Sequence, residues 1–148
     1  MTESEPDSTE RQGPFWDVIA GRAEQPPAAT TLGWELLSVD PERGEIEVGF
    51  TATEGFLNPA GTVQGGFLAA MLDDTMGPAL VATLGRGEFA PTLDLQVQFM
   101  RPGPVGRYVG SGRVVSRGGT IAFLSGELHT AEGELVATAT ATARIIRT

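Results

Sequence analysis

The chain has 148 residues, no cysteine and one histidine, and its 19 acidic and 10 basic residues give a formal net charge of −9. The lack of cysteine excludes disulfides, thiolate nucleophiles and cysteine-ligated zinc, and a single histidine excludes every multi-histidine metal site. The negative charge opposes the phosphate neutralisation that nucleic-acid binding requires, so we expect no nucleic-acid partner and a chemistry run by carboxylates.

The first residues of the chain have the composition of a disordered tail. Residues 1–13 contain no apolar residue after Met1, too little hydrophobic surface to offset the entropy of ordering. We therefore expect disorder over 1–13 and a single domain over 14–148. This start is also acidic and polar, unlike a signal peptide, and no apolar run is long enough to span a bilayer. We expect a cytoplasmic protein with no membrane partner.

One short helix and about six strands follow the tail. Pro14 suits the first turn of a helix that ends near Gly21. From Thr31 onward, alternating apolar and polar residues predict strands. They cover 31–40, 45–50, 92–100, 107–117, 119–130 and 134–146. Glycine-containing turns separate the last three strands, so a single antiparallel sheet is expected.

A second, longer helix is predicted over residues 65–76, and it has no polar face. Six successive positions, 67–72, are apolar, so apolar side chains point in every direction at 3.6 residues per turn. The sheet covers only one side of such a helix, so a second copy of the chain is the expected cover for the other. Pro78 lacks a backbone N–H and is expected to kink or end this helix.

Asp73 and Asp74 interrupt the apolar helix, and Gly65-Gly66 stands at its expected N-terminus. Free backbone N–H groups and the positive end of the helix dipole favour an oxyanion there, and a carboxylate nearby suggests acyl transfer to water. An acid on a buried helix is more often a structural hydrogen-bond acceptor, and that interpretation is retained for Asp74.

The segment NPAGTVQGGFLAAMLDDTMG resembles the helix signature of PaaI-like hotdog-fold thioesterases, and TLDLQVQFMRP resembles the strand that follows it in that family. The resemblance covers roughly residues 30–146. It implies an α+β hotdog fold, with an antiparallel sheet of about six strands wrapped around one long central helix. It also implies a homodimer at least, with a homotetramer as the expected assembly, and hydrolysis of acyl-coenzyme A to free acid and coenzyme A.

The resemblance assigns four catalytic residues. Asp73 matches the acid that acts as general base or nucleophile, and Gly65 matches the glycine whose N–H polarises the thioester carbonyl. Asn58 matches the asparagine near the oxyanion or the attacking water, and Thr92 matches the hydroxyl residue that orients the water. A thioester has a good leaving group, so these groups suffice without a metal or a separate cofactor.

Gln64 departs from the family pattern, which has histidine at this position, and a glutamine cannot titrate near neutral pH. The alternative to a thioesterase is therefore a protein of another functional class, a non-catalytic hotdog module that binds acyl-CoA or a partner protein. Gln64 and Gly66 are expected to contact the substrate, and Arg101 and Arg117 are candidates for the coenzyme A phosphates.

Overall fold

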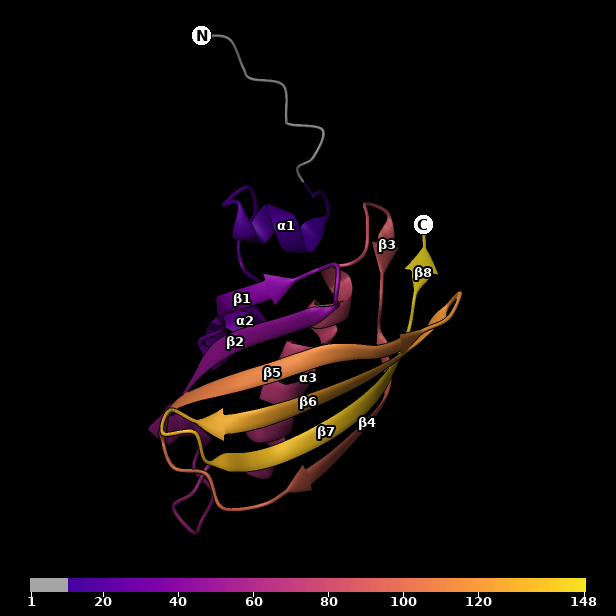
Figure 1. Ribbon diagram of the computed structural model, residues 1–148. Helices are drawn as coiled ribbons and strands as arrows, with labels where there is room; N and C mark the ends of the chain where they lie inside the picture. Colours follow the sequence, from indigo (N-terminus) through magenta and orange to yellow (C-terminus); the bar gives the residue numbers. More distant parts are fainter. Residues whose placement is uncertain (1–10) are drawn as a thin grey trace, which may run out of the picture.

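The computed structural model describes residues 11–148, so the predicted disordered tail lies outside the described residues except for 11–13 (Figure 1). In chain order the elements are α1 (Pro14–Ile19), α2 (Pro27–Leu32), β1 (Glu35–Asp40), β2 (Glu45–Ala52), a 3-10 turn (Glu54–Phe56), α3 (Gly65–Val81), β3 (Glu88–Phe89), β4 (Thr92–Phe99), β5 (Gly106–Arg117), β6 (Ile121–Thr130), β7 (Leu135–Arg144) and β8 (Ile146–Arg147).

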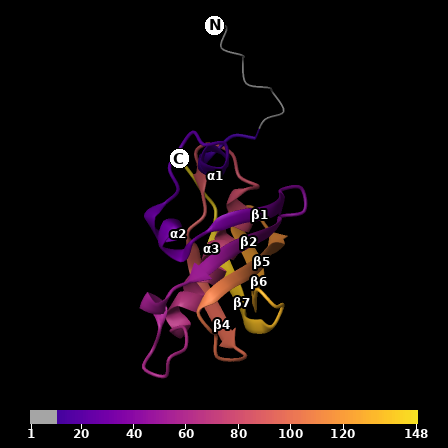
Figure 2. The same ribbon diagram turned by 90° about the vertical axis from the view of Figure 1, so that its left-hand side faces the viewer.

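Six of the strands form one antiparallel sheet, and its order is β1-β2-β5-β6-β7-β4. The short strands β3 and β8 pair separately. α3 runs behind the sheet (Figure 1), and the side view shows the sheet curving across it (Figure 2). Both views place α1 at one end of the molecule and the loop before α3 at the other. The predicted architecture of one long helix held by six antiparallel strands is confirmed.

The core lies between α3 and the concave face of the sheet. Alternate residues of β2 and β6 point inward, among them Val48, Phe50, Leu124 and Leu128, and all are buried. They meet fully buried side chains of α3, the larger of which are Met71, Leu72, Met76 and Leu80. From residue 137 onward, the inward positions of β7 are all alanine, at 137, 139, 141 and 143. Small inward side chains leave room for the helix, as close packing requires.

The closest approach of helix and sheet occurs where α3 crosses β5. A Cβ on Gly112 would lie 3.0 Å from the Thr75 carbonyl oxygen, and a Cβ on Gly110 would collide with Thr75 Oγ1. Thr75 cannot turn away freely, because its hydroxyl donates a hydrogen bond of 2.7 Å to the Met71 carbonyl. These glycines are therefore required by contact distance.

The structure corrects the predicted start of the sheet. Residues 31–34 are not extended, because a second short helix, α2, occupies Pro27–Leu32 and β1 begins only at Glu35. Pro27 stands in the first turn, where a missing N–H costs nothing, and Gly33 ends the helix with a left-handed φ of 68°. Both signals are visible in the sequence, but the helix that begins at the proline is only six residues long.

The structure also corrects one of the two outcomes expected at Pro78, since α3 does not end there but continues to Val81. Proline cannot donate to the carbonyl four residues earlier, which belongs to Asp74. Trp34 supplies the missing donor: its indole Nε1 donates a hydrogen bond of 2.9 Å to the Asp74 carbonyl oxygen. A side chain from the loop before β1 thus replaces one backbone bond of the helix.

The contact between α3 and β5 predicts that Gly110→Ala destabilises the protein. Its methyl group would displace Thr75 or the helix, and overpacking of this kind costs about 1–3 kcal/mol or more. Gly119→Ala is the matched control, because a Cβ there meets nothing within 4 Å and its φ is not in the left-handed region. Urea unfolding should show a lower midpoint for Gly110→Ala alone. Equal midpoints would mean that the helix does not press on β5.

Candidate active site

A cavity of about 590 Å³ lies between α1 and the outward side of α3. Its walls are largely apolar and come from both short helices, from α3 and from the segment before β4. The apolar lining includes Phe15, Val18, Ile19, Ala29, Trp34, Pro78, Val81 and Ala90, and the polar side chains of the lining are Asp17, Glu24, Asp73, Asp74 and Thr92. An apolar recess with a few polar groups at one place is the usual form of a small-molecule site.

The packing of α3 determines where its acids point. Thr75 faces β5, and Asp73 precedes it by two residues, which is about 200° around the helix. Asp73 is therefore half-buried on the side away from the sheet and lines the cavity. Thr92 at the start of β4 donates a hydrogen bond of 2.9 Å from its Oγ1 to Asp73 Oδ1. The two residues predicted to act together are thus in contact.

Asp74 also lines the cavity, but its carboxyl is in a different state. Its Oδ2 is covered from solvent and has no hydrogen-bond partner within residues 11–148. Burial, and secondarily the charge of Asp73, raises the pKa of Asp74 from its ordinary value of 3.8 to about 7. Desolvation penalises the ionised form, so the carboxyl keeps its proton up to neutral pH. The expected structural acceptor role is therefore not seen for this side chain.

The N-terminus of α3 carries the predicted glycine pair. Gln64 is the N-cap and is exposed, and within the described chain its side chain makes no capping hydrogen bond. Gly65 and Gly66 begin the helix, where backbone N–H groups have no intrahelical acceptor. A Cβ on Gly65 would lie 3.1 Å from Cζ of Phe99, so a larger residue would press against β4. Two donors are thus available at this end.

Asn58 organises the loop that leads to this helix. Its Oδ1 accepts hydrogen bonds from the backbone N–H groups of Ala60 and Thr62, at 3.0 and 3.1 Å, and its Nδ2 donates to Thr62 Oγ1 at 3.0 Å. These bonds close the turn from residue 58 to residue 62. The side chain that the resemblance places near the oxyanion is therefore occupied in bracing the approach to Gly65.

The predicted catalytic residues form two groups rather than one. Asp73 and Thr92 lie at the cavity, whereas Asn58 and Gly65 lie at the start of α3. Eight residues of helix separate Gly65 from Asp73, which corresponds to about 12 Å along the axis. One carbonyl group cannot contact both within a single chain.

The two predicted phosphate-binding arginines lie on different parts of the surface. Arg101 forms an ion pair of 3.2 Å with Glu134, and Arg117 donates a hydrogen bond of 3.0 Å to Thr83 Oγ1 near the end of α3. Within residues 11–148, no three histidine, cysteine or acidic side chains are grouped so that they could hold a metal ion. No helix of the described part is long and apolar enough to cross a membrane.

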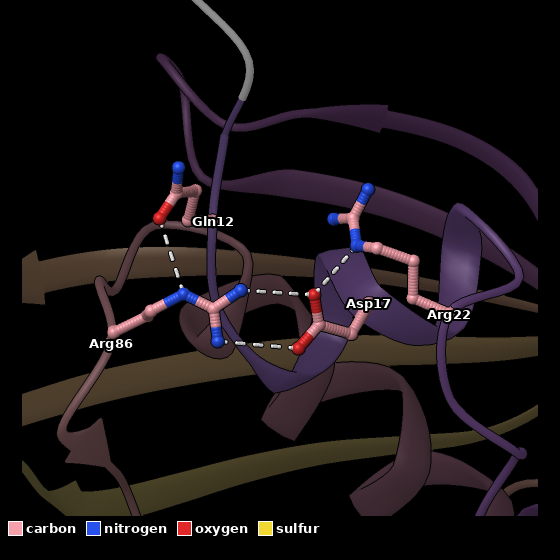
Figure 3. Close-up of polar contacts among 4 residues, drawn as sticks. All are labelled: Gln12, Asp17, Arg22 and Arg86. Atoms are coloured by element: carbon pink, nitrogen blue, oxygen red, sulfur yellow. Dashed lines mark hydrogen bonds and ion pairs between the residues drawn. The ribbon is translucent and has the colours of Figure 1, made fainter. Parts of the chain in front are cut away.

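A charged cluster that the sequence did not indicate holds α1 in place (Figure 3). Arg86, in the loop after α3, contacts Asp17 of α1 at 3.2 Å and the side chain of Gln12 at 3.1 Å. Arg22 reaches the same carboxylate at 3.0 Å. The hydrogen bond from Arg22, together with Arg86, holds the pKa of Asp17 below its ordinary value. Ion pairs therefore hold α1, the helix that covers the cavity, against the rest of the protein.

Comparison with known proteins supports the thioesterase family that the sequence resembles. The family model described as thioesterase superfamily matches residues 60–137. A human protein named acyl-coenzyme A thioesterase 13 is 32% identical over 104 residues, which span 69% of this chain and 72% of that protein. A phenylacetic acid degradation-related protein from Ralstonia eutropha JMP134 has a crystal structure that superposes with a TM-score of 0.86 at 43% identity, over 89% of this chain and 99% of that one.

The PaaI protein of E. coli, from the phenylacetic acid degradation operon, shares the fold with a TM-score of 0.78 at 23% identity, over 89% of this chain and 93% of that one. The six-stranded sheet around one long helix is the hotdog fold, and the protein is a thioester hydrolase of that class. The chain belongs to the thioesterase superfamily, among its PaaI-like members.

The state of Asp74 predicts a pH-dependent effect of Asp74→Asn on stability. Because the folded pKa lies above the unfolded value, the folded state holds the proton more tightly, and the acid lowers the free energy of unfolding as pH rises from about 4 to about 7. Asparagine has no such penalty. The variant should be more stable than the wild type by a few kcal/mol at pH 8, with the gain shrinking below pH 5. Thermal melts of both proteins between about pH 4 and pH 8 measure this difference in stability. A gain in stability that does not vary with pH would contradict the raised pKa of Asp74.

Proposed function

We propose that this protein hydrolyses acyl-coenzyme A thioesters, with Asp73 as the acid that activates water or attacks the carbonyl. The observation that carries the proposal is the Asp73 carboxylate, held by Thr92 at 2.9 Å and placed at the edge of an apolar cavity. The acyl chain would enter the cavity and bring its thioester carbonyl to the carboxylate. The name of the human relative, an acyl-coenzyme A thioesterase, supports this substrate class.

The proposed reaction needs few groups. Asp73 takes a proton from water as the oxygen adds to the carbonyl, and a backbone N–H at the start of α3 stabilises the resulting oxyanion. Collapse of the tetrahedral intermediate expels coenzyme A as thiolate and leaves the free acid, and the proton on Asp73 then passes to the thiolate or to water, which restores the base. Thr92 keeps the carboxylate oriented and is within reach of the water. Neither a metal nor a separate cofactor takes part in this scheme, since coenzyme A belongs to the substrate.

We further propose that each complete site contains residues of two chains. Gly65 lies too far along α3 to serve the carbonyl at Asp73 of its own chain, so a second copy would supply the glycine donor. The edge strand β4 supports such pairing, because it carries exposed apolar side chains. Leu93 and Phe99 of β4 and the following Met100 are exposed by 59%, 53% and 51%. Exposed apolar edge strands are otherwise avoided. A homodimer is the smallest such assembly, and two dimers would form the homotetramer.

The coenzyme A part of the substrate would lie outside the cavity. Arg101 and Arg117 are both exposed at the surface, so each could exchange its present partner for a phosphate. Gln64 is exposed beside the glycine pair and could hydrogen-bond the substrate as an amide. The proposal assigns no proton transfer to this position, which is consistent with glutamine in place of histidine.

Asp73→Asn should lower turnover by about 10²–10⁴-fold, because asparagine keeps the size of the side chain but cannot accept the proton. Glu132→Gln is the control, since it removes an exposed acid of the turn between β6 and β7 that neither lines the cavity nor lies on β4. Release of free thiol from a panel of short, long and aryl-CoA thioesters measures both variants. Equal rates for the two variants would exclude Asp73 from the reaction, and wild-type protein that binds but cleaves none of the panel would favour the binding module.

The shared site predicts that two inactive variants complement each other. In a mixed dimer of Asn58→Ala and Asp73→Asn, one site carries both lesions and the other carries neither. Random mixing places half of the protein in such dimers with half of their sites intact, so about a quarter of wild-type activity should return. Each parent must first be shown to be weak alone, and exchange of chains is verified by differently tagged copies. Verified mixed dimers that gain nothing would show that Asn58 and Asp73 act within one chain.

A further inference from the structure

The cavity under α1 contains an acid that the proposed reaction does not use. The proposed chemistry uses Asp73, Thr92 and a backbone N–H at the start of α3, whereas the neighbouring Asp74 also lines the cavity without a role. The other groups close to it, Trp34 and Pro78, are apolar on the side of the cavity or have their polar atoms occupied elsewhere. Asp74 is therefore a polar group without an assigned role, next to Asp73 in a part of the wall that Trp34 and Pro78 otherwise make apolar.

The carboxyl of Asp74 lacks the partner that such a group normally has. Its Oδ2 is covered from solvent and is unpaired within residues 11–148, and buried polar atoms of this kind are rare because each one destabilises the fold. Leucine or alanine would fit an apolar helix at lower cost. An acid kept under these conditions indicates a hydrogen-bond partner that arrives with a ligand.

The backbone prevents this side chain from moving away from the cavity. Trp34 binds the Asp74 carbonyl at 2.9 Å and the helix continues through Pro78, so the Cα of Asp74 is held on both sides. Rotation about the Cβ–Cγ bond remains open, because this torsion is broad and two-fold for a carboxyl. Either oxygen can thus be turned toward a group within the cavity.

The position of Asp74 beside Asp73 limits where that group lies on the substrate. Consecutive Cα atoms are 3.8 Å apart, and the two side chains diverge by about 100° around the helix. With the thioester carbonyl at Asp73, a substituent two or three bonds further along the acyl chain would come within hydrogen-bond distance of Asp74. The cavity of about 590 Å³ has the size of a pocket for a small organic ligand.

We propose that the cavity between α1 and α3 binds the acyl group of the substrate, and that the carboxyl of Asp74 hydrogen-bonds a hydroxyl or oxo group at carbon 3 of it. This inference rests on the proposed thioesterase function and adds the substrate class. A protonated carboxyl donates to an oxo group, and either protonation state can pair with a hydroxyl, which both donates and accepts. Plain hydrocarbon chains would leave Asp74 unpaired in the complex.

The test compares three coenzyme A thioesters of equal chain length, which are hexanoyl-CoA, 3-hydroxyhexanoyl-CoA and 3-oxohexanoyl-CoA. The wild-type protein should show kcat/KM about tenfold higher for the oxygenated pair, the ratio that one good hydrogen bond supplies. Asp74→Leu and Asp74→Ala remove the carboxyl with and without added bulk, and both should abolish the preference while retaining cleavage of hexanoyl-CoA. Asp74→Asn should retain part of the preference, and Glu132→Gln should retain all of it.

The outcomes separate this inference from the function on which it rests. If the wild type cleaves all three esters but Asp74→Leu and Asp74→Ala leave their ratio unchanged, Asp74 does not select the acyl group. A uniform loss on all three substrates would give Asp74 a structural role and would also overturn the inference. Failure of the wild type to cleave any of a wider ester panel would instead remove the proposed function. The use of two carboxyl-free variants guards against one of them failing to fold, which a thermal melt detects.

Discussion

The contact between α3 and the sheet sets the position of everything else in this protein. At Gly110 and Gly112 no side chain separates helix from strand. The contact of Thr75 with these two glycines therefore fixes the rotation of α3 about its own axis. That rotation turns Met71, Leu72 and Met76 into the core and turns Asp73 away from it. A helix free to roll by one residue would bury the acid and expose an apolar side chain, at a cost in hydrophobic burial and desolvation alike.

The outward side of α3 depends on a second set of contacts, made by the N-terminal segment. Trp34 completes the hydrogen bonding that Pro78 interrupts, and its ring lies edge-on to Phe15 at 6.3 Å. Phe15 in turn stacks edge-on to Trp16, whose indole donates to the carbonyl of Ala82 at 3.2 Å. Aromatic side chains with polar tips can cover a surface and cap its free carbonyls together. The cavity exists because this cover is made of bulky groups that span the helix without filling the space above the two acids.

The sequence predicts most of the fold because its patterns are local. Alternation identifies the strands, and the apolar run after Gly65-Gly66 identifies α3. The helix α2 was missed because its proline and glycine signals enclose only one turn and merge with the strand pattern that follows. The continuity of α3 could not be predicted, since the donor that compensates for Pro78 comes from Trp34, distant in sequence. The resemblance named Asp73 and Thr92 together, and a hydrogen bond joins them in the structure. The pairing of Asp17 with Arg86 has no local sequence signal, because 69 residues separate the two.

The way α1 is attached has a consequence for the behaviour of the enzyme in different solutions. No side chain of α1 is fully buried, and its links to the body include ion pairs of Asp17 with the partly exposed Arg86 and Arg22. Attraction between exposed charges weakens as dissolved ions screen it, over a distance of about 8 Å at physiological ionic strength and less above it. Apolar contacts respond in the opposite sense to excluded salts such as sulfate. The kind and concentration of salt can therefore adjust how firmly α1 is held over the cavity, while the sheet and α3 beneath it stay unchanged.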